Sequence, residues 1–530
     1  MQESSHYWLN LATKEILEHY PVGDLVVSSG ISPSASYHVG HFREILTADA
    51  ICWGLRKSGR KVTHTHVVDN FDPLRKRYDW LPESYESYVG QPICIVPDPF
   101  DKCRARHLTY AEHFYQEFEK YARAMGIGGE GFKVIRSYED LYLTGKMATQ
   151  IEKVIEMQNL VRQIFKDMSN RELGEDWLPL QLLGPHKDFN ELRYQSIEKK
   201  NHQIMGVDSA GTEINLDYSK GEVKLNWRLD WPARWQVLGV KVEPFSAQEH
   251  GAAGGSYDTG VRFSREIFGY EPPIPGVRYA NIHLVGDNKK MSSSKNNLIT
   301  PEEALRIMPA EILRYFIVRS KPDRTLYFDS GIGLFNLIDE YSQIEHKAKN
   351  GEKSEFYDAW EFASGSNNTP LGQKISSVAF NHLVSVYQAA NANSTEALKI
   401  LARTGYTEEV SAQKEVILTE FKFVANWLEQ YAPESVKFKI QDSIPQLELG
   451  LNEKKFLKNL SEAVAAHNDI DGNTMHKLIY DSIQSSEIAA GAAFKAIYQV
   501  ILAKDSGPKA GWFLASLDRS WLIARLALLA

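Results

Sequence analysis

Two histidines near the start of the chain have the residue type and spacing of phosphate-binding groups. His38 and His41 stand on either side of Val39-Gly40. Their ring N–H groups can donate hydrogen bonds to phosphate oxygens, and Gly40 allows the backbone to come close to a ligand. A helix that starts at this point adds backbone N–H groups and the positive end of its dipole. The segment therefore predicts one half of a nucleotide site.

A second segment, about 250 residues further along, has the composition of a mobile phosphate-binding loop. Each segment alone is a weak signal, because a His-x-Gly-His sequence can simply start a helix and a Ser/Lys-rich tract can be a solvated loop. Together they favour a site in which hydroxyl donors and lysine charges close on a polyphosphate. The predicted ATP-binding residues are His38, Gly40 and His41 with Met291, Ser292, Ser293, Ser294 and Lys295, and Lys290 lies just before them.

The hydrophobic pattern indicates the elements that position the histidines. The β-branched run Leu25-Val26-Val27 predicts a strand that ends at Ser28-Ser29-Gly30, and residues 42–58 have a helical pattern. The histidines then lie at a strand-to-helix turn. A second strand-like run over 61–69 leads into Asn70-Phe71-Asp72-Pro73-Leu74-Arg75. Alternating strands and helices indicate an α/β fold with a parallel, doubly wound sheet.

Helical periodicity interrupts this strand pattern and predicts an inserted subdomain at about residues 90–225. Its helices are expected over 107–124 and 145–168. Residues 206–224 are polar and rich in turn-forming residues, so they are expected to form loops.

The chain divides further along into an α/β part and an all-helical part. Beyond Pro301 the strand pattern stops, and from about Ile332 one helical pattern follows another. We expect a catalytic domain over 1–300, connecting helices over 301–345 and an all-helical domain over 346–530.

Composition excludes several classes of protein. The chain has 530 residues, of which 43% are hydrophobic, and this suits a globular protein of several domains. It has no signal-peptide pattern and no apolar run of about 18 residues, so we expect a cytoplasmic protein without a membrane partner. The net charge of −8 is unlike that of a nonspecific DNA binder. A folded RNA remains a possible partner, because local stripes and unpaired bases can carry its recognition.

The three cysteines, Cys52, Cys94 and Cys103, are too few and too scattered for a disulfide framework. Cys103 and His107 would share one face of a helix and could hold part of a metal site. Two ligands do not complete a tetrahedral cage, so a plain thiol and a plain histidine explain the pair without a metal. We predict no metal ligands.

The segment from Trp227 to Trp235 contains three tryptophans and two arginines in nine residues. A hydrophobic cluster, with the aliphatic parts of the arginine side chains packed against it, would explain this composition. The wall of a substrate pocket would explain it equally well.

These segments resemble the class I lysyl-tRNA synthetases over most of the chain. Besides the two phosphate-binding segments, the matching stretches include Asn70 to Arg75, Trp231-Pro232-Ala233-Arg234-Trp235 and Gly254-Gly255-Ser256-Tyr257-Asp258. The phosphate-binding segments are shared by all class I synthetases. The tryptophan and Gly-Gly-Ser-Tyr-Asp segments are far more specific to the lysine family.

The resemblance implies a Rossmann-type catalytic domain with an insertion, followed by an α-helix cage that binds the anticodon. It implies activation of L-lysine with ATP and Mg²⁺, then transfer of lysine to the terminal ribose of tRNA-Lys. The implied catalytic residues are His38, His41, Lys290 and Lys295, and Pro33 is an implied ATP contact. The implied substrate-binding residues are Gly30, Ser32, Glu44, Trp227, His250, Tyr257 and Tyr279.

Glu44 is the first candidate for binding the substrate ammonium. A buried ammonium needs a carboxylate or several acceptors, because an unpaired buried charge costs several kcal/mol. Glu44 follows His41 by about one helical turn. An aromatic wall such as Trp227 would add a cation–π attraction of ~0.5–2 kcal/mol. Alternatively, Glu44 could pair with Arg43 or Lys57.

The chain departs from the family in one respect that changes a prediction. Many members carry a cysteine-rich zinc module where this chain has residues 202–226, a stretch without cysteine, so we predict no zinc. Two other functions are compatible with the overall pattern. A glutamyl-type class I synthetase would need cations facing the substrate side chain. A noncatalytic tRNA-binding paralogue would fit less well, since both phosphate-binding segments are intact.

Overall fold

The computed structural model describes residues 7–100, 108–169, 172–174, 177–286, 291, 298–366, 369–370, 375–446, 448–468 and 470–528. The contacts divide the chain into two compact units. The first unit comprises Met1–Glu302, Arg314–Phe328 and Glu355–Leu371. The second comprises Glu303–Leu313, Asp329–Ser354 and Gly372–Ala530. Across the described residues, we find no helix with both the length and the apolar composition needed to span a bilayer.

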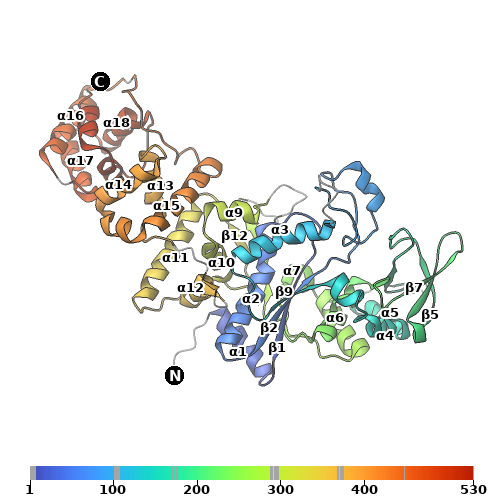
Figure 1. Ribbon diagram of the computed structural model, residues 1–530. Coiled ribbons are helices and arrows are strands. Elements are labelled where there is room, and N and C mark those ends of the chain that lie inside the picture. The colour runs from blue at the N-terminus through green and yellow to red at the C-terminus, as the bar shows by residue number, and fades with distance from the viewer. Residues whose placement is uncertain are drawn as a thin grey trace. The chain divides into compact units, whose positions relative to one another are not determined.

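A parallel sheet forms the centre of the first unit (Figure 1). Its strands, in spatial order, are β1 (Leu25–Ile31), β2 (Val62–Val68) and β3 (Phe132–Arg136). The helices that connect them are α2 (Phe42–Lys57) and α3 (Tyr110–Ala124). On the other edge of β1, Val27 forms a parallel bridge with Val242. The predicted α/β fold with a parallel sheet is confirmed.

Strand β1 is longer than the sequence predicts, because it continues through Ser28-Ser29-Gly30 to Ile31. Both serines are buried, and both have partners inside the sheet region. Ser28 Oγ donates to Glu243 at 3.0 Å, and Ser29 Oγ is hydrogen-bonded to His64 and His66 at 2.9 and 2.8 Å. Since these hydroxyls are satisfied, the strand can keep its parallel register with β2.

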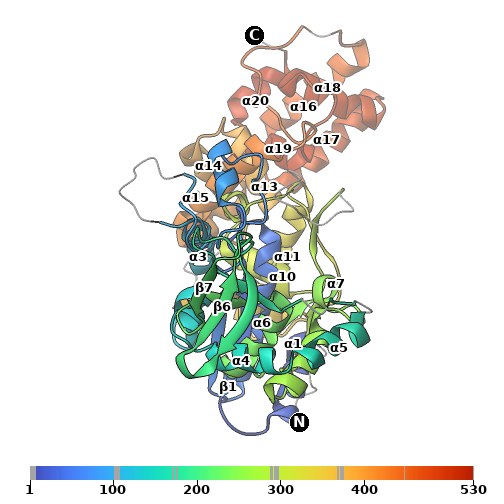
Figure 2. The same ribbon diagram turned by 90° about the vertical axis from the view of Figure 1, so that its right-hand side faces the viewer.

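Helices and antiparallel strands extend the first unit between β3 and the tryptophan segment (Figure 2). The helices are α4 (Ala148–Glu156) and α5 (Gln158–Ser169). One strand pair is β4 (Leu180–Leu182) with β8 (Val223–Leu225), and a separate sheet contains β5 (Arg193–Glu198), β6 (Gln203–Val207) and β7 (Glu213–Asp217). Because β3 still pairs with β2 in the parallel sheet, these additions follow Arg136, whereas the insertion was expected from about residue 90.

The prediction of loops over 206–224 is wrong, since this stretch contains β7, the end of β6 and the start of β8. The polar composition comes from a strand that has one face exposed to solvent. In β7, Glu213 and Asn215 are exposed, whereas Leu216 is buried in the core of the first unit. In a strand of five residues, the alternation of polar and apolar side chains is too short to be recognised in the sequence.

The rest of the first unit consists of further helices and two short strand pairs, of which α6 and α7 contribute to the cavity at the carboxyl ends of the sheet. Its helices include α1 (Trp8–His19), α6 (Trp227–Leu238), α7 (Ala247–His250), α8 (Ser256–Phe263) and α12 (Tyr357–Ser364). Two short parallel pairs join β9 (Phe245–Ser246) to β10 (Arg278–Tyr279) and β11 (Ile282–Leu284) to β12 (Leu326–Phe328). Strand β12 lies beyond Pro301, where the sequence predicts no strand, because three residues are too few to give a pattern.

The second unit is helical. Its helices after residue 330 are α11 (Gly333–Lys349), α13 (Phe380–Ala389), α14 (Ser394–Leu401), α15 (Thr407–Gln430), α16 (Leu451–Ala466), α17 (Gly472–Ser486), α18 (Ala490–Leu502), α19 (Ala510–Ser516) and α20 (Arg519–Leu526). Apolar side chains such as Phe456, Leu460 and Ile497 form its buried core. Within the described residues from 375 onward there is no strand, and the predicted all-helical C-terminal part is confirmed.

Candidate active site

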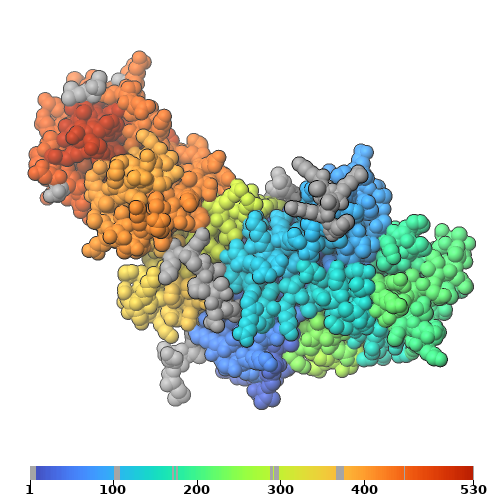
Figure 3. All heavy atoms as spheres, viewed as in Figure 1, coloured from blue at the N-terminus to red at the C-terminus, as the bar shows by residue number. Residues whose placement is uncertain are grey.

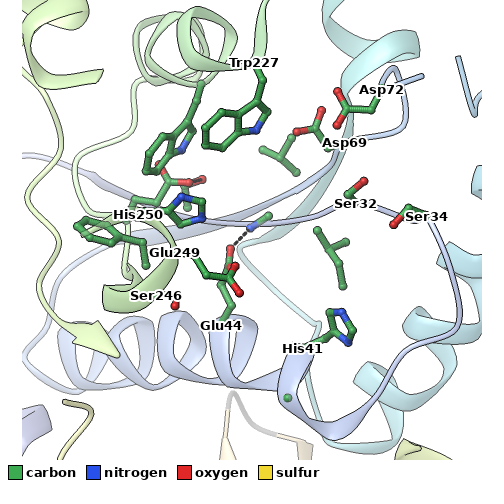
Figure 4. Close-up of a pocket in the computed structure, with 18 of the residues that line it drawn as sticks. Ser32, Ser34, His41, Glu44, Asp69, Asp72, Trp227, Ser246, Glu249 and His250 are labelled. Atoms are coloured by element: carbon green, nitrogen blue, oxygen red, sulfur yellow. Dashed lines mark hydrogen bonds between the residues drawn. The ribbon is translucent and has the colours of Figure 1, made fainter. Parts of the chain in front are cut away.

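A cavity of about 590 Å³ opens at the carboxyl ends of β1 and β2 (Figure 4). This crevice is where doubly wound folds bind their ligands. Residues far apart in the sequence meet there. The predicted site residues that line it are Gly30, Ser32, His38, Gly40, His41, Glu44, Trp227, His250, Tyr279 and Met291.

The two histidines form a compact turn at the start of α2. A short 3-10 helix (Val39–His41) runs directly into α2, and the two rings lie 3.9 Å apart. Gly40 N–H donates to His38 Nδ1 at 3.1 Å, and His38 N–H donates to His41 Nδ1 at 3.1 Å. A neutral ring that accepts at Nδ1 carries its proton on Nε2. These contacts favour the tautomer in which Nε2 is a donor suited to a phosphate oxygen. At His41 they compete with a second contact, because its Nδ1 also lies 3.3 Å from the His38 oxygen, to which only a protonated Nδ1 could donate.

Gly40 is needed for the fold of this turn. A Cβ atom added at Gly40 would lie 2.8 Å from the His38 ring, too close for an ordinary contact. Glycine therefore lets the His38 ring fold over the backbone. The prediction that Gly40 serves close approach is consistent with this geometry, although the approaching group here is the ring itself.

Glu44 is a half-buried carboxylate in the floor of the cavity. Its Oε1 accepts from Gly30 N–H at 2.6 Å, drawn as the dashed line in Figure 4, and its Oε2 accepts from Tyr279 OH at 2.8 Å. Burial raises the pKa of Glu44 to about 7, while these two hydrogen bonds act in the opposite direction. No surface pair with Arg43 forms, because Arg43 donates to the backbone oxygens of Ile317 and Pro322. Glu44 is thus set to receive a cation.

An aromatic wall stands opposite Glu44. The ring of Trp227, at the start of α6, lies 5.8 Å from that of Trp231, and His250 lies 5.5 and 5.3 Å from these two rings. Both interpretations of the tryptophan segment are realised, since all three tryptophans line the cavity while Trp231 and Trp235 are also buried in a hydrophobic cluster. In Figure 4, Glu44 lies between His250 and His41.

Glu243 is a site residue that we did not predict. It accepts hydrogen bonds from Ser28 Oγ at 3.0 Å, from Trp231 Nε1 at 3.1 Å and from Trp235 Nε1. Burial raises its pKa. Its role is to hold the tryptophan wall against β1. Its signal in the sequence was the stretch Glu243-Pro244-Phe245, whose partners are set only by the fold.

A network of buried charges forms the side of the cavity next to β2. Arg234 Nη2 lies 3.0 Å from Asp69 Oδ2 and 3.2 Å from Asp230 Oδ2, and Lys224 Nζ lies 3.2 Å from Asp72 Oδ1. We did not predict these residues either, although Asp69 and Asp72 come directly after a predicted strand. The network joins α6 and β8 to the sheet.

The charges around the cavity suit a cationic ligand. The carboxylates that line it are Glu44, Asp69, Asp72, Glu243 and Glu249, against the guanidinium groups of Arg75 and Arg234. Arg234 is held between two aspartates, as described above. A ligand whose side chain carries an ammonium group is therefore favoured over a ligand whose side chain carries a carboxylate.

Some predicted residues lie elsewhere. Pro33 is buried but does not line the cavity. Tyr257 packs on Phe245, with ring centroids 4.5 Å apart, and donates to the Pro273 oxygen, so it supports the wall from behind. Lys290, Ser292, Ser293, Ser294 and Lys295 lie outside the described residues.

No metal centre is found among the described residues, where no group of three or more His, Cys, Asp and Glu side chains could hold an ion. Cys52 and Cys94 are buried free thiols, and Cys103 and His107 lie outside the described part of the chain. The absence of zinc stays a prediction. Metal analysis of the purified protein should find far less than one zinc per chain, and about one per chain would contradict it.

A second cavity, of about 480 Å³, lies within the helical unit. His382, Tyr406 and Trp512 are among the aromatic side chains that line it, together with Phe335, Phe438 and Phe513. The His382 ring lies 5.1 Å from Tyr406 and 5.8 Å from Trp512, and its buried Nε2 has no hydrogen-bond partner. The exposed Lys509 stands at its edge.

The family model and the sequence relatives agree on one family. The family model described as "tRNA synthetases class I (K)" matches residues 6–366. A lysine–tRNA ligase of Archaeoglobus fulgidus is 38% identical over 502 residues, which cover 94% of this chain and 95% of that protein. A lysine–tRNA ligase of Methanosarcina barkeri is 34% identical, covering 98% and 97%. A solved glutamate tRNA ligase from Elizabethkingia meningosepticum aligns over 95% of this chain and 98% of that chain, with 10% identity and a TM-score of 0.40.

Proposed function

The chain belongs to the class I tRNA synthetases of the lysine type, and from this premise we propose that the cavity of the first unit joins lysine to tRNA-Lys with ATP. The observation that carries the proposal is the half-buried Glu44 carboxylate facing the Trp227 wall, next to the histidine turn. One end of the cavity can hold an ammonium, and the other can hold phosphates.

ATP binds with its phosphates at the histidine turn, where His38 and His41 donate from Nε2. The serine-lysine segment with Lys290 and Lys295 supplies further donors and charge, and Mg²⁺ arrives with the ATP phosphates as part of the substrate. These groups act through their positions. A phosphoryl-type transfer needs donors and cations that stabilise the developing negative charge, and it needs little covalent catalysis by the protein.

Lysine binds with its side-chain ammonium near Glu44, against Trp227. Tyr279 and Gly30 orient the Glu44 carboxylate through their hydrogen bonds, and His250 stacks on Trp227. Ser32 stands near the histidine end. This placement directs the lysine carboxylate toward the phosphates.

The first reaction is an in-line displacement. A lysine carboxylate oxygen attacks the α-phosphorus of ATP, the bond from that phosphorus to the bridging oxygen breaks, and pyrophosphate leaves with the electron pair. His38, His41 and the loop lysines stabilise the charge that builds on the departing group. The product is lysyl-adenylate.

The second reaction transfers the lysyl group to tRNA. A hydroxyl of the terminal ribose attacks the carbonyl carbon of the adenylate, its proton is lost, and AMP leaves. We propose that the protein works in the cytoplasm. The glutamyl alternative is disfavoured by the charge of the cavity, since Arg234 is already held by Asp69 and Asp230.

The test is pyrophosphate exchange into ATP with each amino acid in turn, with and without total tRNA. Lysine should support exchange above all others, and the protein should then attach lysine to tRNA-Lys. Exchange that responds to glutamate in place of lysine would reject the proposal. Tight tRNA binding without exchange or charging would identify a noncatalytic paralogue.

We further propose that the helical unit binds the anticodon, with the His382 cavity as a site for an unpaired base. Unpaired RNA bases are recognised by stacking on aromatic rings and by hydrogen bonds to their edges. His382, Tyr406 and Trp512 supply the rings, and His382 Nε2 supplies an edge contact. Lys509 supplies charge for a phosphate.

Substitution of Trp512 by alanine should lower kcat/KM for tRNA-Lys about 10-fold, because one stacked base contributes ~1–3 kcal/mol. The same change should matter little for a tRNA-Lys already altered in its anticodon. Tyr480→Ala, which removes an exposed ring of the helical unit outside the cavity, is the matched control. Equal losses with both tRNAs would contradict the anticodon role.

A further inference from the structure

Three aromatic rings form a stack at the surface of the first unit. Trp80 lies nearly parallel to Tyr78 on one side and to Phe100 on the other, with centroids 5.9 and 5.8 Å apart and interplanar angles of 11° and 6°. Trp80 is 44% exposed and Phe100 is 51% exposed. Large apolar side chains that are exposed singly need no explanation, but two that lie face to face form a binding surface.

Buried rings hold this stack in place. Trp80 lies 6.3 Å from Tyr110 and 5.8 Å from Phe114, both on α3 and both almost fully buried. Tyr110 OH donates to the Ser34 oxygen at 2.7 Å, and Ser34 lines the active-site cavity. Tyr110 therefore connects the stack to the rim of the cavity.

Positive charge flanks the stack. The segment that precedes Trp80 reads Arg75-Lys76-Arg77-Tyr78-Asp79, with three cations and one carboxylate, in a chain whose net charge is −8. Arg75 and Lys76 are exposed, and Lys76 Nζ lies 5.4 Å from the Tyr78 ring. Figure 3 shows this segment, in lighter blue, at the surface of the molecule.

The stack reaches the cavity, because Tyr78 belongs to the stack and also lines the cavity, as Arg75 does. Parallel aromatic rings with adjacent cations are the means by which proteins hold single-stranded nucleic acid. We propose that Tyr78, Trp80 and Phe100 bind the unpaired 3′ bases of the tRNA, with Arg75 and Lys76 on its phosphates. The inference rests on the proposed function, which requires a terminal ribose to reach the cavity.

The test compares two transcripts of tRNA-Lys, one complete and one that lacks its unpaired 3′ nucleotides. Trp80→Ala and Phe100→Ala should each weaken binding of the complete tRNA about 10-fold, since a stacked base is lost. Binding of the shortened tRNA should not change. Trp80→Phe, which keeps a ring, should recover most of the affinity, and Lys76→Ala should reduce the salt dependence of binding by about one phosphate contact.

Leu143→Ala is the matched control, because Leu143 is 48% exposed in the same unit and does not line the cavity. It should bind both transcripts as the unsubstituted protein does. The proposal would be overturned if the Trp80→Ala and Phe100→Ala variants bound the complete tRNA as tightly as the unsubstituted protein does. It would also be overturned if they lost the same affinity for the complete and the shortened transcript. If Trp80→Ala unfolds, the exposed Phe100 provides the decisive variant. Failure of the proposed function can be told apart from failure of this inference, because in the first case the unsubstituted protein would not charge tRNA with lysine.

Discussion

Replacement of His38 or His41 by alanine should slow lysyl-adenylate formation about 100-fold or more. Both rings line the cavity at the start of α2, and both accept backbone N–H groups at Nδ1, which favours a proton on Nε2. Loss of one preorganised donor to developing charge typically lowers the rate by ~10²–10³-fold. Lysine-dependent pyrophosphate exchange measures the effect, and circular dichroism should show an unchanged fold.

The tautomer provides a sharper test of the same residues. Glutamine places its amide donor near the position of Nε2, whereas asparagine places it near Nδ1. His41→Gln should therefore retain more exchange activity than His41→Asn, and the same order should hold at His38. The reverse order would mean that Nδ1 faces the phosphates. Unchanged exchange in either alanine variant would remove that histidine from the site.

Replacement of Glu44 by glutamine should raise the Michaelis constant for lysine about 100-fold or more. Glutamine keeps the size of the side chain but removes the charge that pairs with the substrate ammonium, and loss of one partner of a buried pair costs ~3–5 kcal/mol. The Michaelis constant for ATP should change little, because the histidine turn is untouched. Equal effects on both constants would indicate a disturbed fold instead of a lost ion pair.

The pH dependence of lysine binding should report the same carboxylate. Burial raises the pKa of Glu44 to about 7, so the empty site gains a proton as the pH falls through that value. Only the ionised form attracts the ammonium, which stays protonated throughout this range. Affinity for lysine should therefore fall about 10-fold between pH 8 and pH 6. Calorimetry at both values measures it, and Glu44→Gln should lose this dependence.

The regular elements of the catalytic unit follow from local sequence. The strand at 61–69 and the helix at 42–58 were predicted to within a few residues, since each has its own hydrophobic period. Strand β1 ran past its predicted end because Ser28 and Ser29 look like turn residues in sequence. Their partners, Glu243, His64 and His66, are far away in the chain, so only the fold could satisfy them.

The sequence by itself predicted the histidine turn, because that motif is local and its residue types limit its chemistry. It offered Glu44 and Trp227 as candidates only through the family resemblance, and it left the tryptophan segment open between a buried core and a pocket wall. Tertiary structure alone decided that Glu243 holds two tryptophans and that Asp69 and Asp230 hold Arg234. The same is true of the stack of Tyr78, Trp80 and Phe100. The physical reason is that hydrogen bonds, ion pairs and ring contacts act over a few ångströms in space, and chain separation carries no signal of which side chains will meet.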